Sequence, residues 1–128
     1  MHNNLPKYYH FISKFEKDDI KNLNKNIAII YRNYNQKIDI NLIKNIKNFL
    51  KRKKIKFFLA NNLKIAIKLN LDGVYIPSFN KSLKINLYSK KKNFIILGSA
   101  HNFKEIKIKE KQGAVAIFLA PIFKTNKT

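Results

Sequence analysis

The sequence contains no cysteine and only three histidines, His2, His10 and His101. The lack of cysteine excludes a disulfide framework, a thiolate nucleophile and a thiolate metal site. A metal ion would therefore need oxygen or imidazole ligands, and three scattered histidines argue against a zinc site. These absences favour chemistry carried by hydroxyl, amide and cationic side chains.

Long hydrophobic runs are also absent. No stretch approaches the ~20 apolar residues of a membrane-spanning helix, and the first ten residues, MHNNLPKYYH, lack the charged-then-apolar order of a signal peptide. We therefore expect a cytoplasmic protein without membrane association. At 128 residues and 45% hydrophobic content, the chain is long enough for one domain with its own core, covering residues 1–128.

Acidic residues and arginine are scarce. Seven Asp and Glu stand against 27 Lys and Arg, giving a net charge of +20, yet the only arginines are Arg32 and Arg52. A basic surface can bind nucleic acid by releasing counterions, but arginine is the preferred side chain for bidentate phosphate and base contacts. Lysine, asparagine and isoleucine are interspersed along the whole chain, as an AT-rich genome would produce. We therefore interpret the charge as compositional bias and keep a basic RNA-binding domain as a less favoured alternative.

Six apolar runs rich in β-favouring residues recur along the chain. Most are continuous rather than alternating, as expected of strands buried on both faces. They cover residues 8–12, 27–31, 55–59, 73–76, 94–97 and 114–119. These runs predict six strands.

Segments with helical spacing lie between the strands and start at residues that cap helices. Asp39 and the pair 61–62 each precede a run with apolar residues on one face. Asn102 and Glu105 have the spacing of a capping box, which predicts a helix with Phe103 facing inward. Each predicted helix connects two predicted strands.

Strand followed by helix, repeated, indicates a parallel sheet. The strands start about 20 residues apart, which is typical of a lean (β/α) barrel, whereas a complete eight-stranded barrel needs ~200 residues. The chain is thus predicted to be α/β, an incomplete (β/α) TIM-type barrel with about six strands and five helices. A compact six-stranded open α/β domain is the alternative.

The carboxyl ends of parallel strands are where binding groups gather. The residues that follow the predicted strands there are hydroxyl, amide and cationic side chains, with no carboxylate among them. They include Arg32, Asn61, Ser99, Thr125 and Lys127. Such a set favours binding of an anion such as phosphate over acid–base catalysis by paired carboxylates.

Several motifs, in order, resemble those of the thiamine-phosphate synthases and the related TenI-like proteins. Residues 71–76, LDGVYI, are similar to the family's ADGVHLGQ segment; residues 96–102, ILGSAHN, to its ilGvSvHs; and residues 120–125, APIFKT, to its GPvFpT. The resemblance covers nearly the whole chain and implies a (β/α) barrel. It also implies a transferase of thiamine biosynthesis, which joins an aminopyrimidine diphosphate to thiazole phosphate and releases pyrophosphate.

The same resemblance implies roles for individual residues. Arg32 stands at the arginine of the family's strand-two motif, Ser99 at its pyrophosphate-binding serine and Thr125 at the first threonine of PTxTK. Lys127 lies one place before the lysine of that motif. These residues are therefore expected to bind phosphorylated substrates.

The family also implies Mg²⁺, which two aspartates hold. The first aspartate position is Asn61 here, and the second is Phe79 or Asn80. An amide can ligate magnesium but contributes no charge, so the site is expected to hold magnesium pyrophosphate less well. Both an active synthase and a non-catalytic, phosphate-binding TenI-like paralogue therefore remain hypotheses.

Family barrels continue with glycine-rich phosphate loops after strands seven and eight, which the 128 residues do not include. An open barrel leaves strands one and six with unpaired edges. The sequence thus predicts either a portion of a longer barrel or a protein that a partner, such as a second copy, closes.

Overall fold

The computed structural model describes residues 5–119, which form six strands and five helical segments. The strands are β1 (Tyr8–Ile12), β2 (Ile27–Tyr31), β3 (Phe57–Ala60), β4 (Gly73–Ile76), β5 (Ile95–Ala100) and β6 (Ala116–Leu119). The helices are α1 (Lys17–Ile20), α2 (Ile40–Arg52), α3 (Leu63–Lys68), the 3₁₀ helix η1 (Leu83–Leu87) and α4 (Phe103–Lys111).

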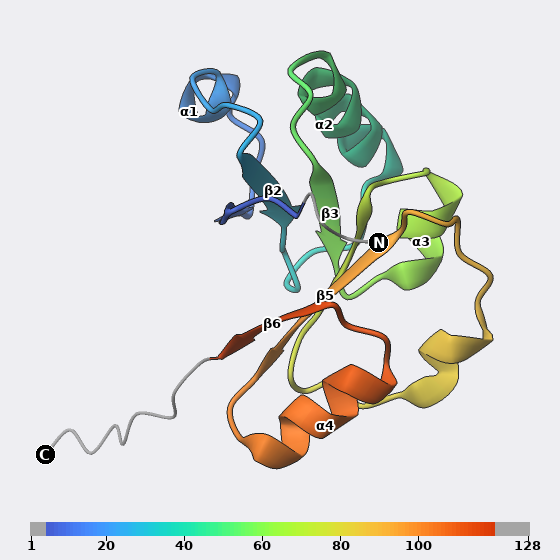
Figure 1. Ribbon diagram of the computed structural model, residues 1–128. Coiled ribbons are helices and arrows are strands. Elements are labelled where there is room, and N and C mark those ends of the chain that lie inside the picture. The colour runs from blue at the N-terminus through green and yellow to red at the C-terminus, as the bar shows by residue number, and fades with distance from the viewer. Residues whose placement is uncertain (1–4, 120–128) are drawn as a thin grey trace, which may run out of the picture.

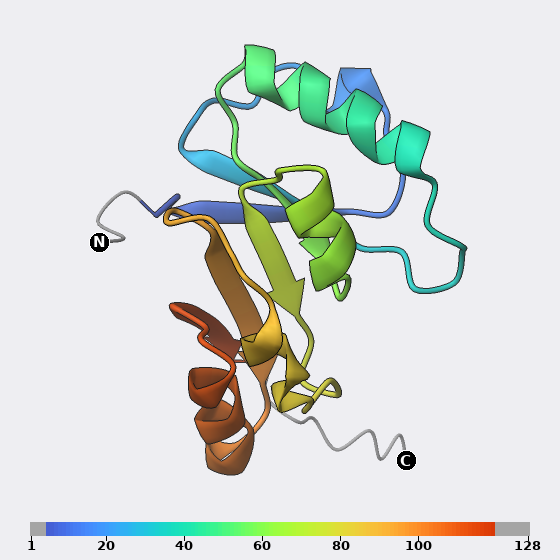
Figure 2. The same ribbon diagram turned by 90° about the vertical axis from the view of Figure 1, so that its right-hand side faces the viewer.

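The strands form one parallel sheet in the order β1-β2-β3-β4-β5-β6. Each strand pairs with the next one in the sequence, whereas an open doubly wound sheet would reverse its order partway. The sheet curls into a half-barrel with the helices around its convex side, and Figures 1 and 2 show this arrangement from two directions. The predicted incomplete (β/α) barrel is therefore confirmed.

Two apolar clusters lie on the two faces of the sheet. On the convex face Ile29, Leu59 and Ile96 pack against helix residues such as Ile43 and Ile46 of α2. On the concave face a second cluster is formed by Ala28, Ile30, Phe58, Ala60, Tyr75, Ile95 and Leu97, with Tyr9, Phe11 and Phe118 beside it. Because both faces are apolar, the strands read as continuous hydrophobic runs.

The predicted helix caps are present. The side-chain oxygens of Asp39, Asn62 and Asn102 accept hydrogen bonds from the backbone N–H groups three residues later, at 3.1, 3.0 and 2.9 Å. Each such bond satisfies an N–H that has no partner within its helix. The starts of α2, α3 and α4 could therefore each be predicted from a single capping residue.

The prediction that Phe103 faces inward is wrong. Its side chain is 71% exposed, and the Lys107 ammonium lies 5.2 Å from the ring centroid. The buried residues at this end of the chain are instead Lys109 and Gln112. Lys109 is six positions after Phe103, which puts the two side chains about 120° apart around the helix.

Strand β5 is longer than predicted. It runs to Ala100 rather than residue 97, because Ser99 and Ala100 pair with Phe118 and Leu119 of β6. Ser99 thus lies within a strand and not in the loop that follows it. None of the helices described between residues 5 and 119 is long and apolar enough to cross a membrane.

Candidate functional site

Three of the predicted site residues lie at the carboxyl ends of the strands β2, β3 and β5. Arg32 directly follows β2, Asn61 directly follows β3, and Ser99 is the penultimate residue of β5. Thr125 and Lys127 lie outside the described residues. The fold thus brings Arg32, Asn61 and Ser99 to the same end of the sheet, as its parallel topology predicts. Their roles in binding stay predictions.

Arg32 is held in place by an aromatic ring. Its guanidinium carbon lies 4.1 Å from the centroid of Phe11 in β1, and Phe11 packs edge-on against the buried Tyr75 of β4 at 5.2 Å. A guanidinium over a ring face is attracted by the ring's quadrupole and keeps its N–H groups free to bind an anion. Arg32 is exposed, so a ligand can reach it.

A shallow hollow of about 260 Å³ lies beside the ends of β2 and β3. Tyr34 and Phe79 form part of its wall and contact each other edge-to-face, with ring centroids 5.5 Å apart. Burial raises the pKa of Tyr34 to about 12, nearby Tyr75 adds to the rise, and Arg32 opposes it. The Tyr34 phenol therefore stays protonated at neutral pH and can donate a hydrogen bond.

Asn61 and Asn80 are joined by a side-chain hydrogen bond. The amide nitrogen of Asn80 donates to Oδ1 of Asn61 at 2.7 Å. Asn61 has a left-handed backbone (φ 57°), a conformation that asparagine tolerates better than most residues, and its N–H donates to the Tyr75 carbonyl at 2.7 Å. The loop after β3 is thereby fixed to β4, with the two amides facing each other.

This amide pair does not fit a magnesium ion. Mg²⁺ is normally held through at least one carboxylate, whereas Asn61 and Asn80 are neutral and Oδ1 of Asn61 is already used by an N–H donor. Oδ1 of Asn80 accepts from the Ser82 backbone N–H at 3.1 Å. Within residues 5–119, no three His, Cys, Asp or Glu side chains lie close enough to hold a metal.

The loop that carries Asn80 is fastened from behind by two buried polar side chains. The Lys109 ammonium donates to the Asn80 carbonyl at 2.9 Å, and the Gln112 amide donates to the same oxygen at 2.8 Å and to the Ser82 carbonyl at 3.1 Å. Both side chains are fully buried. Burial lowers the pKa of Lys109, with Glu105 opposing this and Lys81 adding to it.

Ser99 is buried on the edge of the site. Its hydroxyl oxygen accepts a hydrogen bond from the Ser78 backbone N–H at 3.1 Å. Because the oxygen accepts this bond, the hydroxyl hydrogen is free to donate to a further acceptor. Ser99 thus links the ends of β4 and β5 and offers one donor.

His101 stabilises a turn rather than the site. Its backbone N–H and its ring Nδ1 both contact Oε1 of Glu105, at 2.7 and 3.1 Å. These contacts lower the pKa of Glu105, the backbone hydrogen bond contributing most. His101 is therefore part of the turn before α4.

Sequence reasoning missed the residues that position Asn80. Lys109 and Gln112 lie 29 and 32 residues further along the chain, and a buried lysine contradicts the usual hydropathy pattern. The one indication in the sequence is that Lys109 and Gln112 are three positions apart, because residues at this spacing lie on one side of a helix.

Known protein families and structures include relatives of this chain. Residues 22–128 match the family model described as thiamine monophosphate synthase. A curated protein of Aquifex aeolicus, described as "Putative thiamine-phosphate synthase 2", is 36% identical over an alignment of 89 residues, and the match covers 66% of this chain and 45% of that protein.

A solved structure has the same fold. Thiamine phosphate pyrophosphorylase from Pyrococcus furiosus superposes with a TM-score of 0.66 at 18% identity, over 96% of this chain and 64% of that one. The chain thus spans about half the length of the curated relative and under two thirds of the solved one.

Proposed function

Because the chain belongs to the thiamine monophosphate synthase family, we propose that it acts in thiamine biosynthesis through the carboxyl-end site described above. The reaction proposed is transfer of the aminopyrimidine-methyl group from its diphosphate to the ring nitrogen of thiazole phosphate. The bond between the methylene carbon and the diphosphate oxygen breaks with its electrons leaving on pyrophosphate, and the nitrogen lone pair forms the new bond.

The proposal rests on the position of Arg32, Asn61 and Ser99 at the carboxyl ends of β2, β3 and β5, with donors that suit phosphate. Arg32 supplies a charge-assisted, bidentate donor. The Ser99 hydroxyl supplies a second donor. In this account the chain's residues bind and orient the two phosphorylated reactants, which raises their effective concentration without any acid–base step.

The hollow beside Tyr34 and Phe79 supports binding of a flat heterocycle. Its aromatic edge and its amide groups come from the loops after β2, β3 and β4. An aromatic wall with a few polar groups is typical of sites for small heteroaromatic molecules. Arg32 and Tyr34 are close in the sequence, so one ligand could place its phosphate at Arg32 and its ring at Tyr34.

A second candidate function is binding of a phosphorylated ligand without turnover. The hydrogen bond between Asn61 and Asn80 favours it, because neutral amides occupy the positions where the family resemblance implies magnesium aspartates. A site without those carboxylates retains phosphate donors while it has less means of stabilising a leaving pyrophosphate.

One pair of assays separates the two candidates. Thiazole phosphate binding to the 128-residue chain is measured by calorimetry, and thiamine phosphate formation is measured with both substrates, with and without Mg²⁺. Saturable binding with product supports the transferase, and binding without product supports the second candidate. No binding would contradict both.

A further inference from the structure

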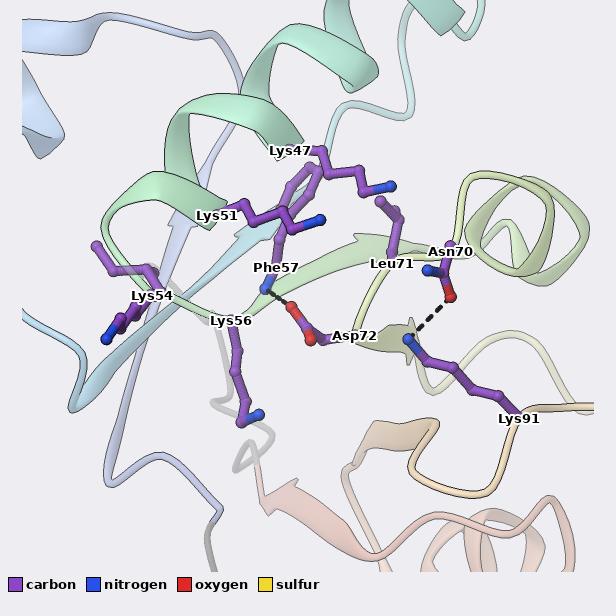
Figure 3. Close-up of a pocket in the computed structure, with 10 residues that line it drawn as sticks. Lys47, Lys51, Lys54, Lys56, Phe57, Asn70, Leu71, Asp72 and Lys91 are labelled. Carbon is purple, nitrogen blue, oxygen red and sulfur yellow. Dashed lines mark hydrogen bonds between the residues drawn. The ribbon is translucent and has the colours of Figure 1, made fainter.

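A second cavity lies at the opposite end of the sheet from the candidate site. It has a volume of about 380 Å³ and is bordered by the segments that lead into β3, β4 and β5 and by the last turns of α2. Figure 3 shows the side chains around it. This size is within the range of small-molecule sites, and the position at the amino ends of the strands separates it from Arg32 and Asn61.

Lysines dominate the walls of this cavity. Five of its ten lining residues are lysines, namely Lys47, Lys51, Lys54, Lys56 and Lys91. They come from three separate segments of the chain: α2, the connection from α2 to β3, and the segment before β5. Half of the lining is therefore cationic, against 27 basic residues of 128 in the whole sequence.

The ammonium groups of the cavity are not neutralised by carboxylates. Among residues 5–119 none of the five lysines forms a salt bridge, and Lys91 donates instead to Oδ1 of Asn70 at 3.0 Å. The single acidic lining residue is Asp72, whose Oδ2 accepts from the Phe57 backbone N–H at 2.8 Å. Five like charges around one hollow repel each other, and a multivalent anion would relieve that repulsion.

The donors present define the class of anion. The cavity contains no arginine, the end of α2 beside it is a C-terminus whose dipole disfavours anions, and the Phe57 N–H is already bonded to Asp72. A single small phosphate would find no directed set of N–H donors. Lysines on several sides act as point charges, which suit an extended chain of phosphates.

We propose that this lysine cavity binds a polyphosphate anion, either free polyphosphate or the triphosphate of a nucleotide. Lys47, Lys51 and Lys91 contact separate phosphates around the rim, and the buried Ile55, Phe57 and Leu71 form an apolar floor. Asp72 keeps the ligand on the rim by repelling phosphate from the floor. This site is independent of the one assigned to thiamine biosynthesis.

Calorimetric titration with tripolyphosphate tests the proposal. The unaltered chain is expected to bind one equivalent, and Lys47→Gln with Lys51→Gln is expected to weaken binding about tenfold. The matched control, Lys107→Gln with Lys111→Gln, makes the same charge change at the same i, i+4 spacing on α4, which contributes no lining residue to the cavity, and is expected to change affinity less than about twofold. Equal losses in the two double variants, or no binding by the unaltered chain, would overturn the proposal.

Asp72→Asn provides a gain-of-binding test that misfolding cannot imitate. The amide oxygen keeps the acceptor for the Phe57 N–H, while the negative charge is removed, so tripolyphosphate is expected to bind several-fold more tightly; weaker or unchanged binding counts against the site. A parallel titration with ATP distinguishes the two sources. Tighter binding of ATP assigns a nucleotide, and equal affinity assigns free polyphosphate.

Discussion

The carboxyl ends and the amino ends of the same parallel sheet carry different polar chemistry. At the carboxyl ends Asn61, Asn80 and Ser99 are fixed by hydrogen bonds to each other or to the backbone. At the amino ends the lysines of the cavity lie mostly without partners among the described residues. An oriented set of donors can select a ligand by shape, whereas a group of point charges selects by charge.

The largest effect is expected from adding a methyl group at the amino end. A Cβ at Gly73 would meet the Ile95 carbonyl and lie 2.7 Å from Cε2 of Phe58, and backbone cannot move aside as a side chain can. Gly73→Ala should therefore lower the free energy of unfolding by about 3 kcal/mol, as measured by urea denaturation.

The same substitution within β5, at Gly98, is the control. A Cβ at Gly98 would lie 2.5 Å from Cδ of Lys109, a flexible side chain. Gly98→Ala should cost less than Gly73→Ala. A larger loss at Gly98 would show that Lys109 cannot shift.

The buried lysine behind the candidate site should matter nearly as much. Lys109→Ala removes a fully buried stem and the hydrogen bond to the Asn80 carbonyl, so unfolding should become easier by about 2 kcal/mol. Lys107→Ala on the same helix removes an exposed pair with Glu110 and should change stability by less than about 0.5 kcal/mol. Thermal denaturation of the two variants gives the comparison, and equal effects would deny Lys109 a structural role.

Substituting each of the two arginines tests whether phosphate binding depends on the position of Arg32 or only on the positive charge of the chain. Arg32→Ala should weaken thiazole phosphate binding about tenfold, because a charge-assisted donor is lost. Arg52→Ala removes the same charge at the end of α2 and should leave binding within about twofold. Calorimetry on both variants decides the matter; similar losses would remove Arg32 from the site.

Restoring carboxylates should restore a preference for magnesium. Asn61→Asp with Asn80→Asp places two negative charges at an existing 2.7 Å contact, so we expect Mg²⁺ to stabilise this variant by about 1 kcal/mol. The exposed pair Asn45→Asp with Asn48→Asp on α2 serves as the control. Thermal shift with and without Mg²⁺ is the measurement, and an equal shift in the unaltered chain would mean that the amides already bind magnesium.

The smallest effect concerns pH. The folded chain holds the Tyr34 proton more tightly than the unfolded chain does, since its pKa is raised from 10.0 to about 12. This contribution to stability is present below pH 10 and is lost as the pH rises toward 12. Tyr34→Phe should therefore lose less stability than the unaltered chain between pH 10 and pH 12, as followed by circular dichroism; parallel curves would deny the pKa shift.

Much of the fold was predictable because its determinants are local. Continuous apolar runs gave the strands, and Asp39, Asn62 and Asn102 marked helix starts through bonds to residues three positions away. The error at Phe103 arose because hydropathy favours burying phenylalanine over lysine. The sheet needs a long side chain at position 109, which passes over Gly98 to reach the Asn80 carbonyl.

The candidate site was predictable only in part. In a parallel sheet the carboxyl ends of all strands lie at the same end of the sheet. Arg32, Asn61 and Ser99 could therefore be chosen as site residues from the predicted ends of the strands. The pairing of Asn61 with Asn80 depends on a loop fixed by Lys109 and Gln112. These contacts join residues 19, 29 and 32 positions apart in the sequence, and no local sequence pattern specifies contacts over such distances.

Binding of thiazole phosphate at the carboxyl-end site can be followed by NMR, by titrating the isotope-labelled 128-residue chain with this ligand. We expect the largest chemical-shift changes at Arg32, Asn61 and Ser99, with small changes at Lys47, Lys51 and Asp72. Changes confined to the lysine cavity, or no changes at either end of the sheet, would contradict binding at the carboxyl-end site.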